Sequence, residues 1–312
     1  MINEWNGLVT EATGEELLQK QRDLAYQTVN RLGGGPELEM LLEFLKTKGA
    51  GDLRKEILDQ GLDGIFTGEL AERSRQWLLS IKDAKLKEQL MLKAGAAFEG
   101  SGFVEYFQQV GASPNGHNNQ YRLLTGYCST LAKTDPEAAM KKYAELAYPL
   151  RIDNAGFPEI VANFPSETDF LKFATTVIGE DTKVHGRSAR TSLLRNWAGV
   201  KPEEAAQYVL ANSKTTSVNP VQMEVVMQTW AQNSPEAAQK WLGALSPSLA
   251  KDHGTIAMAN FYQKTEPATA FTYATSVGDY EKKVATSTTI FKEWAKTDKK
   301  AAEAAWLKAF PQ

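Results

Sequence analysis

Three evenly spaced histidines raise the question of a shared metal or catalytic site. His117, His185 and His253 are separated by two equal intervals of sixty-eight positions. They fall fourteen, twelve and nine positions before bulky residues of a recurring pattern described below, so they occupy different positions in that pattern. In stacked helices, residues two such units apart lie roughly 20 Å from one another, whereas the ligands of one metal lie about 2 Å from it. We therefore expect ordinary histidines in loops or at helix starts, with no metal site and no cofactor.

The other residues that could do chemistry also have simpler explanations. Cys128 is the only cysteine, which excludes an internal disulfide and a zinc site built on several cysteines. It lies three residues before Leu131 on an apolar helix face, so we expect a buried thiol rather than a nucleophile. The stretch RLGGGPE (31–37) lacks the lysine and the Ser or Thr of a phosphate loop and is predicted to end a helix. No catalytic motif or acid–base pair stands out, and the chain is predicted not to be an enzyme.

A row of polar residues is the better candidate for a functional surface. It occupies the one or two positions before the recurring bulky residues, and Lys292 continues it. The candidates for a peptide-binding groove are Thr130, Asn163, Arg195, Asn196, Gln228, Thr229 and Asn260. Carboxamides can satisfy both the donors and the acceptors of a peptide backbone, so the row suits an extended peptide. A solvated helix face is the alternative.

A local basic strip is the second candidate surface. Arg187, Arg190 and Arg195 lie on one expected helix, and Arg151 is a further arginine that this strip could include. An acidic segment of a partner protein could dock on the strip, although a solvated helix face explains it equally well.

The elements that would position these residues recur at a nearly constant interval. The segment WAGVKPE (197–203) is matched by WAQNSPE (230–236), thirty-three positions further along the chain. Steps of 33 backward and 32 forward reach further bulky residues, which we call anchor residues: Phe98, Leu131, Phe164, Tyr262 and Trp294, with Leu32 and Phe66 as weaker matches. A second bulky residue recurs eleven or twelve positions after an anchor position: Phe44, Trp77, Tyr143, Tyr208, Trp241, Tyr273 and Trp306. Such a period is typical of a stacked repeat architecture.

Each repeat is predicted to be two helices that meet at a corner. Apolar residues three and four positions before an anchor form one helical face, as Leu193 and Leu194 do before Trp197. Pro136 and Pro235 take the first position of a second helix, where the missing N–H costs nothing. The residues expected to cap second helices with their side chains are Asp135, Ser234 and Asp298. The alanines expected to be buried in second helices are Ala139, Ala205, Ala238, Ala270 and Ala302.

These patterns predict an all-α chain that forms a right-handed α-solenoid. We expect eight or nine stacked helical hairpins with a period of about 32–33 residues, and we find little sign of strands. Residues 1–97 are predicted to be divergent helical repeats that keep only the approximate spacing of the bulky residues. Residues 98–312 are predicted to be regular helical hairpins, continuous with the first part.

The corner and its aromatic residues resemble a known class of repeats. Two helices per repeat of about 33 residues, with small and aromatic residues at fixed places, are similar to the tetratricopeptide and Sel1-like α-solenoids. The pattern W-A-x-x-D/S-P-E-A-A is closer to divergent bacterial helical-hairpin repeats, because no Leu-Gly pair recurs here and the aromatic anchor lies at the end of its helix. The resemblance implies a helical-repeat fold and a general role in binding proteins, and it implies no catalytic residues.

Composition narrows the classes of partner. The chain has 35 basic and 38 acidic residues, a net charge of −3, which favours no nucleic acid. No apolar run reaches the roughly 18 residues that a membrane span needs, so no membrane insertion is expected. The first residues do not form a signal peptide. A soluble protein of the cytoplasm and an exported protein whose signal has been removed both fit the sequence.

The sequence therefore predicts a non-enzymatic helical-repeat protein that binds or scaffolds another protein or peptide through its concave face. Trp306 and Phe310 lie near the C-terminus without an obvious polar capping helix, so self-association through the last repeat is a further expectation. The alternative is a carbohydrate-active or glycan-binding protein built on a helical toroid. A closed ring with clustered carboxylates in a central cleft would distinguish that alternative from an open stack.

Overall fold

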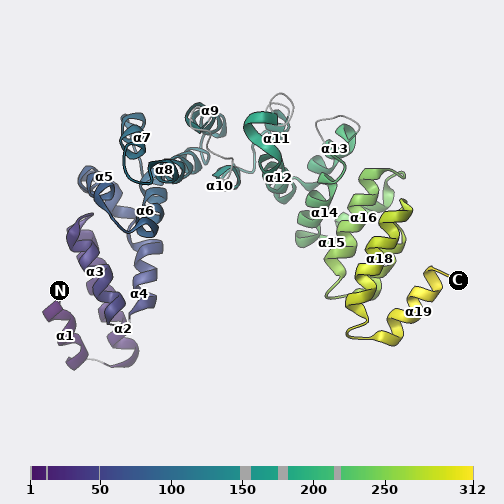
Figure 1. Ribbon diagram of the computed structural model, residues 1–312, viewed down its shortest axis with the longest axis horizontal. Coiled ribbons are helices and arrows are strands. Elements are labelled where there is room, and N and C mark those ends of the chain that lie inside the picture. The colour runs from purple at the N-terminus through teal and green to yellow at the C-terminus, as the bar shows by residue number, and fades with distance from the viewer. Residues whose placement is uncertain are drawn as a thin grey trace. The chain divides into compact units, whose positions relative to one another are not determined.

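The computed structural model describes residues 2–11, 13–48, 50–147, 156–174, 182–213 and 219–311, and of residues 2, 9–11 and 182–189 it describes only the backbone. Every regular element in these ranges is a helix (Figure 1), which confirms the predicted all-α class. The chain divides into two compact units, Met1–Pro165 and Ser166–Gln312. The predicted boundary at residues 97 and 98 is a division of sequence pattern and stays a prediction.

In its described residues, the first unit holds ten α-helices. Their bounds are α1 Ile2–Glu11, α2 Gly14–Leu32, α3 Pro36–Thr47, α4 Gly51–Glu56, α5 Ala71–Ser80, α6 Ala84–Ala96, α7 Phe103–Gly111, α8 Gly116–Leu131, α9 Pro136–Ala147 and α10 Phe157–Val161. A π-helical turn (Ile57–Gly61) and two 3₁₀ turns (Asp63–Phe66 and Gly68–Leu70) join α4 to α5. The predicted stop in the glycine-rich stretch is confirmed, because α2 ends at Leu32 and Gly33 follows it with a φ of 64°.

Two glycines bring α6 and α8 into close contact. A Cβ atom added to Gly95 of α6 would lie 2.0 Å from the carbonyl oxygen of Leu123 in α8. A Cβ atom added to Gly126 of α8 would lie 2.0 Å from the carbonyl oxygen of Leu92 in α6. The two helices therefore approach one another backbone to backbone at a distance that only glycine permits on each side.

The part of the second unit that the structure describes holds nine α-helices. Their bounds are α11 Phe170–Phe173, α12 Thr182–Val200, α13 Pro202–Asn212, α14 Gln222–Asn233, α15 Pro235–Ala244, α16 Leu249–Tyr262, α17 Pro267–Thr275, α18 Tyr280–Trp294 and α19 Lys299–Ala309. Sequential helices pack as pairs, and α12, α14, α16 and α18 also contact one another in that order. Figure 1 shows α14, α16 and α18 side by side.

The corners of this unit share one backbone geometry. The residues before α13, α15, α17 and α19 have φ between −155° and −132° and ψ between 69° and 82°. Each of them donates its N–H to the carbonyl of the anchor residue four positions earlier, at 2.7 to 2.9 Å. Proline takes the first position of α9, α13, α15 and α17, as the corner pattern predicts. The five predicted alanines are fully buried at 0% exposure, which confirms their role as close-packing residues.

The predicted side-chain caps are confirmed at two of three corners. Asp135 accepts the N–H of Ala138 at 2.9 Å, and Asp298 accepts that of Ala301 at 3.0 Å. Ser234 precedes α15 as predicted, but its side chain accepts no capping bond, so that part of the prediction is wrong. Ser248, whose ψ is 162°, does cap α16, because its side chain accepts the N–H of Lys251. At the corner ψ of 75° the shorter serine side chain falls short, whereas the longer carboxylate of Asp298 reaches the amide.

Aromatic rings eleven residues apart meet inside successive hairpins. The ring centroids are 5.3 Å apart for Trp197 and Tyr208, 5.6 Å for Trp230 and Trp241, and 5.8 Å for Tyr262 and Tyr273. The anchors Phe164, Trp197 and Trp230 are buried. An anchor at the end of a first helix therefore packs on the second bulky residue near the end of the helix that follows.

The last helix packs inward with its aromatic residues. The ring of Trp306 lies 6.2 Å from Phe271, 5.2 Å from Phe291 and 4.6 Å from Phe310. Leu307 of the same helix is 58% exposed. Self-association through this end stays a prediction, and Leu307 is the apolar side chain of α19 that such a contact would cover.

Candidate functional site

Four polar residues occupy the same position on alternate helices of the second unit. Arg195, Gln228, Asn260 and Lys292 each lie two residues before an anchor, on α12, α14, α16 and α18. All four are exposed. The helices that carry them contact one another in sequence order, so the four residues mark one polar line across the unit, which we call the polar row.

The other groove candidates are tied to backbone carbonyls or lie in the first unit. Thr229 donates its hydroxyl to the carbonyl of Val225 at 2.9 Å, and Asn196 is half-buried. In the first unit, Thr130 donates to the carbonyl of Ala96 at 2.9 Å and Asn163 to that of Glu159 at 2.7 Å. The seven groove candidates therefore fall in both units. Three of them, Arg195, Gln228 and Asn260, belong to the polar row.

The basic strip lies on α12. Arg195 is exposed, and Arg190 is half-buried near Tyr208. Burial raises the pKa of Tyr208, and the Arg190 guanidinium partly opposes that rise. The side chain of Arg187 and all of Arg151 lie outside the described residues. Docking of an acidic segment on this strip stays a prediction.

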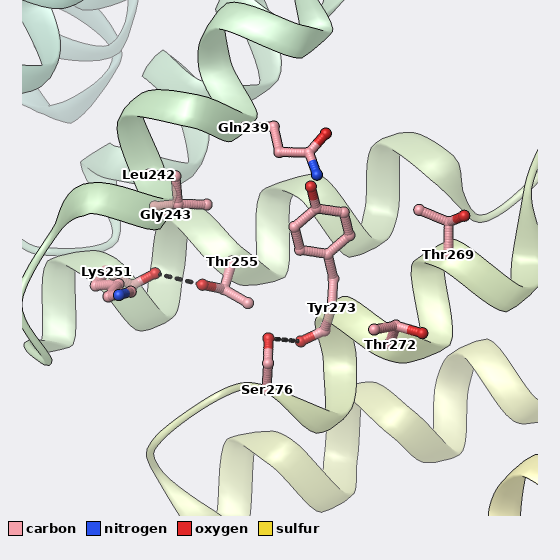
Figure 2. Close-up of a pocket in the computed structure, with 9 residues that line it drawn as sticks. All are labelled: Gln239, Leu242, Gly243, Lys251, Thr255, Thr269, Thr272, Tyr273 and Ser276. Carbon is pink, nitrogen blue, oxygen red and sulfur yellow. Dashed lines mark hydrogen bonds between the residues drawn. The ribbon is translucent and has the colours of Figure 1, made fainter.

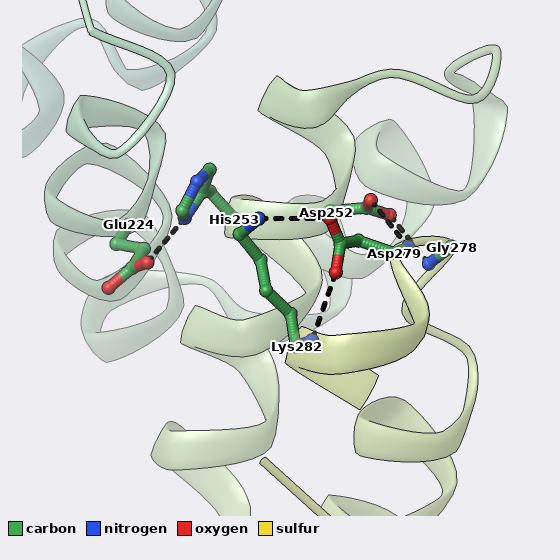
Figure 3. Close-up of polar contacts among 6 residues, drawn as sticks. All are labelled: Glu224, Asp252, His253, Gly278, Asp279 and Lys282. Carbon is green, nitrogen blue, oxygen red and sulfur yellow. Dashed lines mark hydrogen bonds and ion pairs between the residues drawn. The ribbon is translucent and has the colours of Figure 1, made fainter. Parts of the chain in front are cut away.

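A polar network holds α14 against α16 beside the polar row (Figure 3). Nδ1 of His253 lies 2.6 Å from Oε1 of Glu224, one turn before Gln228 on α14. His253 is buried in the second turn of α16, so the expectation of a histidine in a loop or at a helix start is wrong for this residue. The half-exposed carboxylate gives the buried imidazole a polar partner and joins the two helices at this point.

A second set of polar contacts joins Asp252, the residue before His253, to the start of α18 (Figure 3). The carboxylate of Asp252 accepts the N–H groups of Gly278 and Asp279, at 2.7 and 3.0 Å. Asp279 in turn accepts the Lys282 N–H at 3.0 Å and its ammonium at 3.1 Å. The backbone hydrogen bond from Lys282 is the main cause that lowers the pKa of Asp279, with a further contribution from the Lys282 side chain. These bonds position α16 and α18, and with them Asn260 and Lys292.

A cavity of about 490 Å³ opens between α15, α16 and α17 (Figure 2). Its wall includes Gln239 and Gly243 of α15, Thr255 of α16, and Thr272 and Tyr273 of α17. The hydroxyl oxygen of Tyr273 is buried and makes no hydrogen bond to the protein. In Figure 2 this hydroxyl points toward the carboxamide of Gln239. The volume lies in the range of ordinary small-molecule pockets.

Sequence reasoning missed both the network and the cavity. The signal for the polar contacts was a pair of residues on neighbouring first helices. Glu224 lies six residues before Trp230, and His253 lies nine residues before Tyr262. The signal for the cavity was a set of small or polar residues on second helices, such as Gly243, Thr269 and Thr272. Neither signal is specific, because helices carry such residues on solvated faces as well.

The remaining residues singled out for chemistry are accounted for locally. Cys128 is fully buried, and burial raises the pKa of its thiol to about 12, which confirms the prediction of a buried thiol. His117 is exposed at the second position of α8, and the side chain of His185 lies outside the described residues. Among the side chains that the structure describes, no group of three or more His, Cys, Asp or Glu could hold a metal ion.

None of the helices that the structure describes is both long and apolar enough to cross a membrane. Comparison of the chain with protein-family models, with curated proteins and with solved structures found no match.

Proposed function

We propose that the helical hairpins are repeats of one unit, stacked as a right-handed α-solenoid with a period of about 32–33 residues. The shared backbone angles before α13, α15, α17 and α19 support this proposal, since those corners start at the nearly evenly spaced positions Lys201, Ser234, Glu266 and Asp298. The ring pairs eleven residues apart and the buried alanines support it as well. The resemblance to tetratricopeptide and Sel1-like repeats fits the same architecture.

We propose that the protein binds or scaffolds another protein by holding an extended segment of it along the polar row. The observation that carries this proposal is the exposure of the same position on four alternate helices that contact one another in order. Neighbouring packed helices are about 10 Å apart, and an extended strand rises about 3.3 Å per residue. Each residue of the row would therefore meet about every third residue of the bound segment.

The chemistry of the row suggests the character of that segment. Arg195 and Lys292 are cations at the two ends, and Gln228 and Asn260 lie between them. The carboxamides suit the N–H and C=O groups of a peptide backbone, and the cations suit carboxylates. We infer a preference for acidic side chains about nine residues apart, which is three steps of about 10 Å divided by the rise of an extended chain. Net charge is close to balance, so recognition rests on this pattern rather than on the field of the whole molecule.

We also propose that the chain acts without catalysing a reaction. The ionisable side chains that lie close together here are engaged in helix contacts, since Glu224 pairs with His253 and Asp252 binds two backbone N–H groups. Such engagement supports a positioning role for them.

The test is peptide selection on the intact chain. A displayed library of twelve-residue peptides would be panned on the wild type, on Gln228→Ala/Lys292→Ala, and on Gln207→Ala/Lys300→Ala, a matched control with one exposed glutamine and one exposed lysine on second helices. We expect enriched peptides with spaced acidic residues whose binding falls at least about tenfold in the row variant, the effect of losing one or two such contacts. The control should retain binding. Equal binding by all three proteins would remove the polar row as the site.

A further inference from the structure

The cavity between α15, α16 and α17 shares no residue with the polar row. We propose that it is a second binding site and that it takes a neutral, polyhydroxylated ligand, a sugar residue. The proposal does not depend on peptide binding by the row, because the two sites use different residues of the second unit and can be tested separately.

The threonine and serine hydroxyl groups in the wall already donate hydrogen bonds within the protein. Thr255 donates to the carbonyl of Lys251 at 2.9 Å, Thr272 to that of Ala268 at 3.0 Å, and Ser276 to that of Tyr273 at 2.8 Å. A hydroxyl that donates to a fixed carbonyl offers only lone pairs to other partners. These wall residues therefore present acceptors, and a ligand rich in hydrogen-bond donors fits them.

Two groups remain that can both donate and accept. The buried Tyr273 hydroxyl has no partner in the protein, and burial raises the pKa of Tyr273, so this hydroxyl stays protonated at neutral pH. The Gln239 carboxamide points at it from α15 (Figure 2). A buried hydroxyl without a partner costs stability. The Gln239 side chain that covers it is exposed, so its rotation would admit a ligand hydroxyl and remove that cost.

Charge narrows the ligand further. Of the nine residues that line the cavity, only Lys251 is charged, and its ammonium donates to the carbonyl of Leu245. The positive charge of Lys251 disfavours binding of a cation, and the acceptor oxygens of the wall hydroxyls disfavour binding of an anion. Glu266, the residue before α17, accepts the hydroxyl proton of the wall residue Thr269. Neutral hydroxyls satisfy all of these conditions, and the Tyr273 ring in the middle of the wall provides an apolar surface for sugar C–H groups.

The test uses saturation-transfer NMR on the full chain with defined probes. The neutral probes are glucose, maltose, N-acetylglucosamine and its β-linked dimer. The charged comparators are glucuronate and glucosamine, and N-methylacetamide represents amide ligands. We expect transfer to at least one neutral sugar and weaker transfer to the charged sugars. Transfer to no neutral sugar, or to the amide alone, would overturn the proposal.

Three variants locate the site. Tyr273→Phe removes only the unpartnered hydroxyl and should lower the affinity for the bound sugar about tenfold. Gly243→Leu adds a side chain where a Cβ meets nothing within 4 Å, so it should fold normally and abolish transfer by filling the opening. Tyr280→Phe, at an exposed tyrosine of α18, is the matched control and should bind like the wild type. Undiminished binding by Gly243→Leu, with a helical spectrum like that of the wild type, would also overturn the assignment.

Discussion

Burial changes the chemistry of two side chains in the first unit. The thiol of Cys128 is fully buried on α8, and desolvation raises its pKa to about 12. Lys87 is only 3% exposed, and burial lowers the pKa of its ammonium, which donates to the Leu79 carbonyl in the last turn of α5 at 2.7 Å. The cation satisfies a carbonyl at the end of that helix and interacts favourably with its dipole.

The first prediction concerns the reactivity of Cys128. A thiol with a pKa near 12 is almost entirely protonated at pH 8, and the thiolate is the reactive form. We expect negligible labelling of the folded protein by a disulfide-exchange reagent at that pH, and labelling of one thiol per chain after unfolding in guanidinium chloride. Rapid labelling of the folded chain would contradict the burial of Cys128.

The second prediction concerns the acid dependence of the cap on α18. The pKa of Asp279 is lowered in the folded chain, so its stabilising contribution is complete above its unfolded pKa, about 3.9, and is lost as the pH falls through the folded value. The midpoint of thermal unfolding should therefore differ between wild type and Asp279→Ala at pH 7, and the difference should shrink toward pH 3. Asp279→Asn keeps a capping side chain and should lie between them at pH 7. A difference that does not change with pH would contradict a charged cap.

At the scale of a helix, the corners allow a third prediction. Asp135→Ala and Asp298→Ala should each cost about 1 kcal/mol in the free energy of unfolding, because each removes a capping bond. Ser234→Ala should cost markedly less, since the Ser234 side chain makes no such bond. Denaturant unfolding of the three variants measures this contrast. Equal losses at all three positions would show that the caps do not differ as described.

The contact between α6 and α8 allows a fourth prediction. Gly126→Ala would force a methyl group against the Leu92 carbonyl and should destabilise the chain by about 1–3 kcal/mol or more. The control is Gly199→Ala on α12, where an added Cβ comes no closer than 4.0 Å to a neighbour, and it should be neutral or slightly stabilising. Chemical denaturation compares them. A neutral Gly126→Ala would mean that the two backbones do not approach so closely.

Local physical chemistry explains which features the sequence could predict. The corner depends on a proline, a cap and a small residue within a few positions of one another, so its helices, buried alanines and two side-chain caps could be predicted. The Gly95 and Gly126 contacts, the Glu224–His253 pair and the cavity depend on how closely separate helices approach. That distance is set by packing between segments about thirty residues apart, which one sequence does not reveal.

For the whole molecule, packing between neighbouring hairpins determines how damage spreads. Trp230 lies in the last turn of α14 and packs on Trp241, and α14 contacts both α12 and α16. Trp230→Ala should cost about 3–5 kcal/mol. Because α14 packs against both α12 and α16, the substitution should also lower hydrogen-exchange protection in those two helices.

The matched control for that fifth prediction is Trp306→Ala in the last helix, where the ring is half-buried. Its effect on hydrogen exchange should be smaller and confined to α17, α18 and α19, the helices near its ring contacts. Loss of protection limited to α14 and α15 in Trp230→Ala would show that the hairpins unfold independently.

The corner geometry has a consequence for how such chains diverge. Lys201, Ser234, Glu266 and Asp298 have four different side chains on nearly the same backbone, because the bond that closes each corner runs from main chain to main chain. Substitution at this position can therefore change the residue type while the backbone of the turn stays the same. On the proposal that the hairpins are repeats of one unit, their similarity should persist in backbone torsion angles after it has been lost from the aligned residues. A search that compares dihedral angles would then detect repeats that a search by residue identity misses.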